Sequence, residues 1–151
     1  MKKRIYVLLA VIAVLVMSSQ TFGSSGVKWV SLEEGMEKAK TEKKPMIVDF
    51  FFGKGCPRCE KLEEGVYNNP AIAKKIMDDF IPIRVDLTKK LTAEEEKLGN
   101  QYDYKQDCLL LFLDSGGGII KDPSGKRLCF AENVEPEWFI KYLDMVKEKQ
   151  K

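Results

Sequence analysis

The stretch "DFFFGKGCPRCEKLEE", residues 49–64, decides the fold of this chain. It continues an apolar run, residues 46–52, whose length and aromatic content are typical of a buried strand. Gly53 and Gly55 then predict a turn, and Pro57 suits the first position of a helix. We therefore expect a strand, a bend and a helix that begins beside Cys56.

The two cysteines of this stretch, Cys56 and Cys59, are placed for thiol chemistry. At a helix N-terminus, free N–H groups and the helix dipole favour an anion, and Arg58 adds a positive charge. We expect these to lower the pKa of Cys56 below the usual value of about 8.5. Cys59 lies one helical turn away on the same face, from where it can attack a mixed disulfide formed at Cys56. A redox pair, an inert structural disulfide and half of a metal site all remain open.

Composition removes several classes of function. The chain has 151 residues, enough for one domain with a proper core. It contains no histidine, which excludes histidine-based triads, general bases and metal ligands. Its formal net charge of +2 gives no basic footprint for nucleic acid, so no nucleic-acid partner is expected.

The N-terminal 23 residues form a separate segment. Lys2, Lys3 and Arg4 precede an uninterrupted apolar run, residues 5–17, and small polar residues follow. This layout predicts a signal peptide over 1–23 and a mature domain over 24–151, exported to the periplasm or secreted. An uncleaved membrane anchor is the alternative, although the run is short for a span of about 20 residues. Outside the cytosol the even count of four cysteines favours disulfides.

The rest of the chain alternates helical and strand patterns. Strands are expected at 46–52, 81–87, 108–114 and 127–131, and the last two as an antiparallel hairpin. Helices are expected at 31–45, from 56 onward, and at 69–80, 92–102 and 135–149, the last with Trp138 on its apolar face. Alternation of strands and helices predicts a parallel portion of the sheet. The fold class is therefore α/β, with a central mixed β-sheet flanked by helices on both faces.

Four segments carry a resemblance to a known family. They are "WVSLEEGMEKAKTEKKPMIVDFF" (29–51), "CPRCEKLEEGVYNNPAIAKKIMDDFIPIRVDL" (56–87), "LLLFLD" (109–114) and "PEWFIKYL" (136–143). With these the chain resembles the thioredoxin superfamily over about 27–147. It is most similar to exported thioredoxin-like domains related to the C-terminal domain of the thiol:disulfide interchange protein DsbD.

The resemblance implies a thioredoxin fold and a thiol-disulfide oxidoreductase. Cys56 would be the exposed nucleophile and Cys59 the buried resolving cysteine, with Pro57 and Arg58 between them. Asp49 would be the buried aspartate that moves protons for the resolving cysteine. Protein thiols and disulfides are the implied substrates, and a membrane electron donor of the DsbD type is the implied partner. No cofactor beyond the redox-active disulfide is implied, and the similarity favours reduction or disulfide exchange over oxidation.

Three positions depart from the family pattern. Gly55 stands where thioredoxins have a tryptophan. Asp49 lies seven residues before Cys56, one more than the common spacing, so a solvated aspartate at a strand end is the alternative. Cys108 stands where the family has a cis-proline opposite the cysteine pair, so a cis peptide is not expected there.

Cys129 falls on the second strand of the expected hairpin, where it could oppose Cys108. Directly opposed residues in an antiparallel pair lie about 4.5–5.5 Å apart, which suits a disulfide. One hypothesis is a second disulfide, Cys108–Cys129, that exchanges with the 56–59 pair. Another is a metal-binding or thiol-carrier module that uses Cys56, Cys59, Cys108 and Cys129. The remaining alternatives are a Cys129 that is merely a small buried residue and a non-catalytic interaction domain with structural disulfides.

Overall fold

The computed structural model describes residues 26–104, 110–121 and 135–150. Four of its longer helices match the expected ones within a few residues. α3 is continued directly by a short π-helical segment, η1. In chain order the elements are α2 (Leu32–Glu42), β1 (Met46–Phe51), α3 (Pro57–Leu62), η1 (Glu63–Tyr67), α4 (Pro70–Asp79), β2 (Ile81–Asp86), α5 (Ala93–Gln101), β3 (Leu110–Leu113) and α6 (Pro136–Glu148).

The sheet is mixed, as the sequence predicts. Its strand order is β2-β1-β3, with β1 parallel to β2 and antiparallel to β3. A bridge between Val30 and Ile83 extends the sheet beyond β2, and a bridge between Leu113 and Ile119 extends it beyond β3. The parallel pairing sets Asp49 directly beside Arg84.

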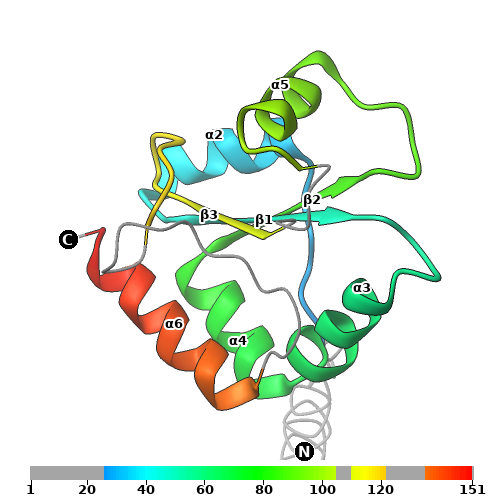
Figure 1. The fold of residues 1–151 in the computed structure, drawn as a ribbon. Helices are drawn as coiled ribbons and strands as arrows, with labels where there is room; N and C mark the ends of the chain where they lie inside the picture. Colours follow the sequence, from blue (N-terminus) through cyan, green and yellow to red (C-terminus); the bar gives the residue numbers. More distant parts are fainter. Residues whose placement is uncertain (1–25, 105–109, 122–134, 151) are drawn as a thin grey trace, which may run out of the picture.

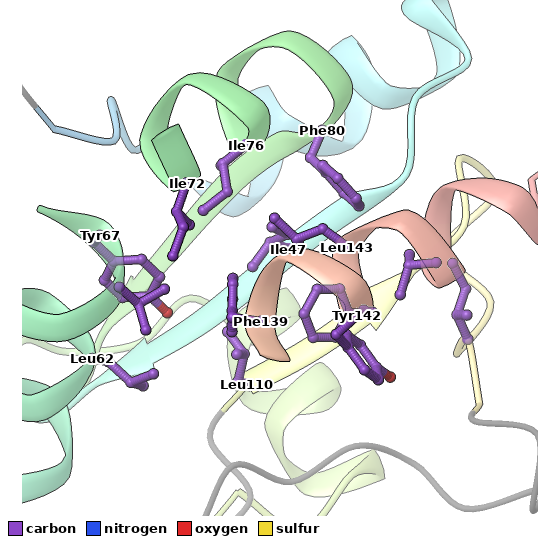
Figure 2. Close-up of a cluster of buried hydrophobic side chains, with 14 residues drawn as sticks. Ile47, Leu62, Tyr67, Ile72, Ile76, Phe80, Leu110, Phe139, Tyr142 and Leu143 are labelled. Atoms are coloured by element: carbon purple, nitrogen blue, oxygen red, sulfur yellow. The ribbon is translucent and has the colours of Figure 1, made fainter. Parts of the chain in front are cut away.

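Helices cover both faces of the sheet (Figure 1), with α2 and α5 on one side and α3, α4 and α6 on the other. Strand alternation produces this arrangement, because successive side chains of β1 point to opposite faces. Met46, Val48 and Phe50 pack with α2, whereas Ile47 packs with the other helices. Figure 2 shows the apolar cluster on the side of the sheet that carries α4 and α6, where Ile47 contacts side chains of both helices. The predicted α/β class, a central mixed sheet with helices on both faces, is confirmed.

Side-chain caps set where the main helices begin. Ser31 accepts a hydrogen bond from the Glu34 N–H at the start of α2, and Asn69 caps α4. Thr92 and Glu95 form a capping box at the start of α5. All three starts agree with the sequence, since a capping side chain satisfies N–H groups that have no partner within the helix.

Several expectations need correction or are not tested. The last hairpin was expected to pair 108–114 with 127–131. Within the described residues, the pairing that follows β3 joins Leu113 to Ile119, just after a turn that contains three glycines. The side chain of Asp114 closes this turn, because it accepts hydrogen bonds from the N–H groups of Gly116 and Gly118. The expected strand at 127–131 lies outside the described residues, as do the segment 1–23 and the start of the domain at 24 and 25. Trp138 is 52% exposed, so its expected place on the apolar face of the last helix was wrong. None of the helices within the described ranges is long and apolar enough to cross a membrane.

Candidate functional site

The turn between β1 and α3 presents the cysteine pair. Gly53 and Gly55 both have a φ of +86°, a conformation that residues with a Cβ rarely adopt. The predicted bend is therefore real, and it accounts for the glycine where the family has a tryptophan. The four turn residues, 52–55, supply the extra position that separates Asp49 from Cys56.

Cys56 and Cys59 form a disulfide. Their sulfur atoms are 2.27 Å apart and their Cα atoms 5.2 Å apart. Cys56 is the N-cap of α3 and is partly exposed, whereas Cys59 lies inside the first turn and is 8% exposed. The two sulfurs therefore differ in access to solvent, and Cys56 is the one that a partner molecule can reach more easily.

The start of α3 is held by hydrogen bonds around the pair. The Cys59 N–H donates to Sγ of Cys56 over 3.2 Å, and the Gly55 N–H donates to Oε1 of Glu60 over 3.1 Å. Pro57 occupies the first helical position, where no intrahelical N–H bond is needed. The N–H that reaches Cys56 is a donor in place to stabilise negative charge on that sulfur.

Asp49 is buried on the face of β1 that is covered by α3 and η1. It is 4% exposed, so the alternative of a solvated aspartate at a strand end was wrong. Nε and Nη2 of Arg84 lie 3.0 Å from its Oδ2. The same Nη2 lies 2.9 Å from Oε2 of Glu63, whose side chain is 40% exposed. Arg84 thus links a buried carboxylate to a half-exposed one.

Aromatic rings surround the guanidinium of Arg84. Its Cζ lies 4.2 Å from the ring centroid of Trp29, 4.7 Å from that of Phe51 and 5.6 Å from that of Tyr67. Trp29 in turn packs edge-on against Tyr67. Cation–π contacts and two carboxylates fix the position of this cation between β1 and η1, the segment that continues α3.

Burial dominates the protonation behaviour of this cluster. It raises the pKa of Asp49 from 3.8 to about 6, against opposing effects of Arg84 and, more weakly, Arg58. Burial also raises the pKa of Tyr67 well above its usual value, and the charge of Asp49 adds to that effect. Asp49 can therefore take up or release a proton close to neutral pH.

Of the predicted site residues, the structure places Cys56, Pro57, Arg58 and Cys59 together at the start of α3, and it buries Asp49 in β1, the strand that leads to them. Cys108 and Cys129 lie outside the described residues. In the described part of the chain no group of three or more cysteine, aspartate or glutamate side chains could hold a metal ion. The structure therefore does not test the predicted Cys108–Cys129 disulfide or the predicted metal site of four cysteines.

Sequence reasoning missed four residues of the cluster, namely Arg84, Glu63, Trp29 and Tyr67. Arg84 carried a signal, because a lone arginine between Ile83 and Val85 in an apolar strand requires a buried partner. Its parallel register with Asp49 supplies that partner. Glu63 carried no signal of this kind, since it lies in a run of charged helical residues.

The comparisons with known proteins agree with this geometry. Residues 28–114 match the family model described as thioredoxin-like. An uncharacterized protein of Archaeoglobus fulgidus is 32% identical over 92 residues, which is 60% of this chain and 72% of that protein. The chain belongs to the thioredoxin-like family.

Two solved structures support the same fold. A thioredoxin from Thermus thermophilus has a TM-score of 0.63 and 21% identity, covering 83% of this chain and 90% of that one. The oxidised C-terminal domain of DsbD from Neisseria meningitidis has a TM-score of 0.53 and 21% identity, covering 78% and 98%. The predicted family is confirmed, and with the Cys56–Cys59 disulfide the chain is a thioredoxin-like thiol-disulfide oxidoreductase.

Proposed function

We propose that this protein reduces or exchanges disulfides of protein substrates through a mixed disulfide at Cys56. The observation that carries the proposal is the unequal burial of one disulfide, with Cys56 partly exposed at the N-cap and Cys59 buried behind it. A nucleophile must be reachable, whereas a resolving thiol must be shielded from other disulfides.

The reaction balances within the cysteine pair. The Cys56 thiolate attacks one sulfur of the substrate disulfide, which forms a mixed disulfide and expels the other substrate sulfur as a thiolate. The Cys59 thiolate then attacks Sγ of Cys56, which forms the 56–59 disulfide and releases the second substrate thiolate. Two electrons pass from the cysteine pair to the substrate, whose two thiolates take up protons.

Neighbouring groups support each half of this reaction. The Cys59 N–H and the N-terminus of α3 favour an anionic sulfur at Cys56. For the second half, Cys59 must lose its proton before it can attack. Asp49, with its pKa near 6, is the proton acceptor that we assign to this step.

Phe52 is suited to contact a polypeptide substrate. It is 45% exposed and lies in the turn immediately before the cysteine pair. An exposed aromatic ring beside a reactive sulfur favours apolar segments of protein, so extended or unfolded chains are the substrates that we propose.

Export and electron supply complete the proposal. The basic and apolar layout of residues 1–23 supports export to the periplasm or secretion, with a membrane reductant of the DsbD type returning Cys56–Cys59 to the thiol form. Cell fractionation and the redox state of the pair in cells that lack such a reductant test these two points. A cytosolic protein with an unchanged redox state would contradict both.

Insulin reduction in the presence of dithiothreitol tests the mechanism. Cys56→Ser should abolish the activity. Reduced Cys59→Ser, incubated with insulin after dithiothreitol has been removed, should accumulate a covalent complex that added dithiothreitol dissolves. Thr41→Ser on α2, far from the pair, is the matched control and should keep full activity. Full activity in Cys56→Ser would refute the proposed role of this residue.

A further inference from the structure

A groove of about 630 Å³ lies between α2 and α5, on the side of the sheet opposite to the disulfide helix. Its apolar lining comes from Leu32 and Met36 of α2, Leu98 of α5 and Leu113 of β3. These side chains belong to the core cluster on the α2 side, whereas Leu62 of α3 belongs to the other cluster. The groove is therefore a separate site from the cysteine pair.

The composition of α5 explains why the groove is open. The only buried residue of this helix is Gly99, which packs against the ring of Tyr104 and does not line the groove. Leu98 is half-buried, and it is the one large apolar residue that α5 contributes to the lining. A helix that packs so little of itself against the sheet leaves the side chains of Met36 and Leu98 partly exposed, above a floor formed by the buried Leu32 and Leu113.

Carboxylates dominate the rim of the groove. Glu33 and Glu37 lie one turn apart on α2, and Glu94 lies on α5. None of these three exposed side chains forms an ion pair or hydrogen bond with any residue in the described ranges. Glu95 is used in the capping box, and Lys97 is the cationic side chain of the lining. Carboxylates on both walls therefore outnumber the cationic side chain of Lys97, and the rim is negative.

Charge and shape together define what fits this groove. An anionic lipid surface or a nucleic acid would be repelled by the carboxylates of both walls. A small polycation would pair with the rim but would leave the apolar floor uncovered. A peptide with apolar residues on one face and lysine or arginine beside them satisfies both features.

We propose that the groove between α2 and α5 binds a cationic amphipathic peptide segment of a partner protein. The apolar side chains of the segment cover the partly exposed Met36 and Leu98. Its basic side chains pair with Glu33, Glu37 and Glu94. This binding is independent of the proposed redox function, because the groove shares no residue with the cysteine pair.

Fluorescence anisotropy with a labelled helical peptide of leucine and lysine tests the proposal. The leucines are placed at helical spacing, and a second peptide has serine in place of every leucine. The full-length protein should bind the leucine peptide at least about tenfold more tightly than the serine peptide. Equal affinity for the two peptides, or equal displacement by spermine, would show simple charge attraction and overturn the proposal.

Matched charge reversals locate the binding. The double variant Glu33→Lys, Glu37→Lys should weaken binding by at least about tenfold. The control, Glu137→Lys with Glu148→Lys on α6, changes the net charge equally at exposed sites outside the groove and should leave the affinity within about twofold. Glu94→Lys tests the opposite wall separately. Equal weakening by the α6 control would contradict a site in the groove.

The methyl group of Met36 reports occupancy directly. Its NMR signal, assigned with Met36→Leu, should shift when the leucine peptide is added, both with the disulfide intact and after reduction. A binding peptide that leaves this signal unchanged would place the contact elsewhere. The double variant Glu33→Lys, Glu37→Lys should reduce insulin as fast as the wild type. Failure of the groove proposal would therefore appear in peptide binding alone, and failure of the redox proposal in insulin reduction alone.

Discussion

Arg84 and Asp49 lie side by side on two parallel strands, with Nη2 of the arginine 3.0 Å from Oδ2 of the aspartate. Glu63, the first residue of η1, shares the same guanidinium nitrogen. Burial raises the pKa of Asp49 and Arg84 lowers it, and burial is the larger effect. The balance between them leads to two predictions.

The stability of the protein should depend on the protonation of Asp49. Its pKa is about 6 in the folded state, against 3.8 for the ordinary group, so the folded state binds this proton more tightly than the unfolded state. The unfolding free energy contributed by Asp49 is therefore fully present below pH 4 and is lost as the pH rises to about 6. The loss should be about 3 kcal/mol.

Urea denaturation between pH 4 and pH 7 measures this loss. Other carboxylates titrate in the same range, so the informative quantity is the difference between the wild type and Asp49→Asn. The wild type should lose about 3 kcal/mol more than the variant over this interval. Parallel pH profiles for the two proteins would show that Asp49 does not titrate there.

Removal of the arginine should raise the pKa of Asp49 further. In Arg84→Met the buried carboxyl keeps its desolvation but loses the nearest positive charge and its hydrogen bonds. The midpoint of the Asp49 carboxyl signal in a ¹³C NMR titration should therefore move above 6. Lys54→Met removes a positive charge from the exposed turn and should leave that midpoint in place. A downward shift in Arg84→Met would contradict the assigned role of the arginine.

Much of this arrangement could be predicted from local sequence, because local features have local causes. The caps at Ser31, Asn69 and Thr92 and the bend at Gly53 and Gly55 follow from side-chain and backbone preferences within a few residues. The apolar strands likewise follow from their composition and length.

The partners of Asp49 could not be predicted in the same way. Arg84 lies 35 residues away along the chain, and its contact with Asp49 depends on the register of β1 with β2. Glu63 reaches the same arginine because η1 carries it over that strand pair. The exposure of Trp138 also depends on tertiary packing, since helical spacing does not reveal which edge of an apolar face the core will cover.

The two cysteines of the pair should react at different rates once they are reduced. Cys59 is 8% exposed and lies inside the first turn of α3, whereas Cys56 caps the helix. Brief treatment with iodoacetamide, followed by peptide mass spectrometry, should therefore find Cys56 modified well before Cys59. In urea the two should be modified at similar rates, which is the control. Faster modification of Cys59 in the folded protein would reverse the proposed roles.

The reduction potential of the 56–59 pair should indicate the direction of the reaction. A protein that reduces or exchanges disulfides should have a potential near that of thioredoxin, about −270 mV. Equilibration of the pair with glutathione or dithiothreitol buffers and trapping of the thiols measures this value. A potential near −120 mV would indicate an oxidant and would refute the reductase role.

The two glycines of the active-site turn should differ in their tolerance of a side chain. Both have a φ of +86°, so alanine at either position should cost about 1–2 kcal/mol in backbone strain. At Gly55 an added Cβ meets no atom within 4 Å, so strain is the whole cost. At Gly53 the Cβ would lie 2.6 Å from Cγ2 of Thr88, which adds a steric clash. Urea denaturation should therefore show Gly53→Ala to be clearly less stable than Gly55→Ala.

The double variant Gly53→Ala, Thr88→Ser tests whether the clash causes this difference, because it lacks the clashing methyl group. It should recover most of the difference in stability. No recovery would show that the clash is not the cause.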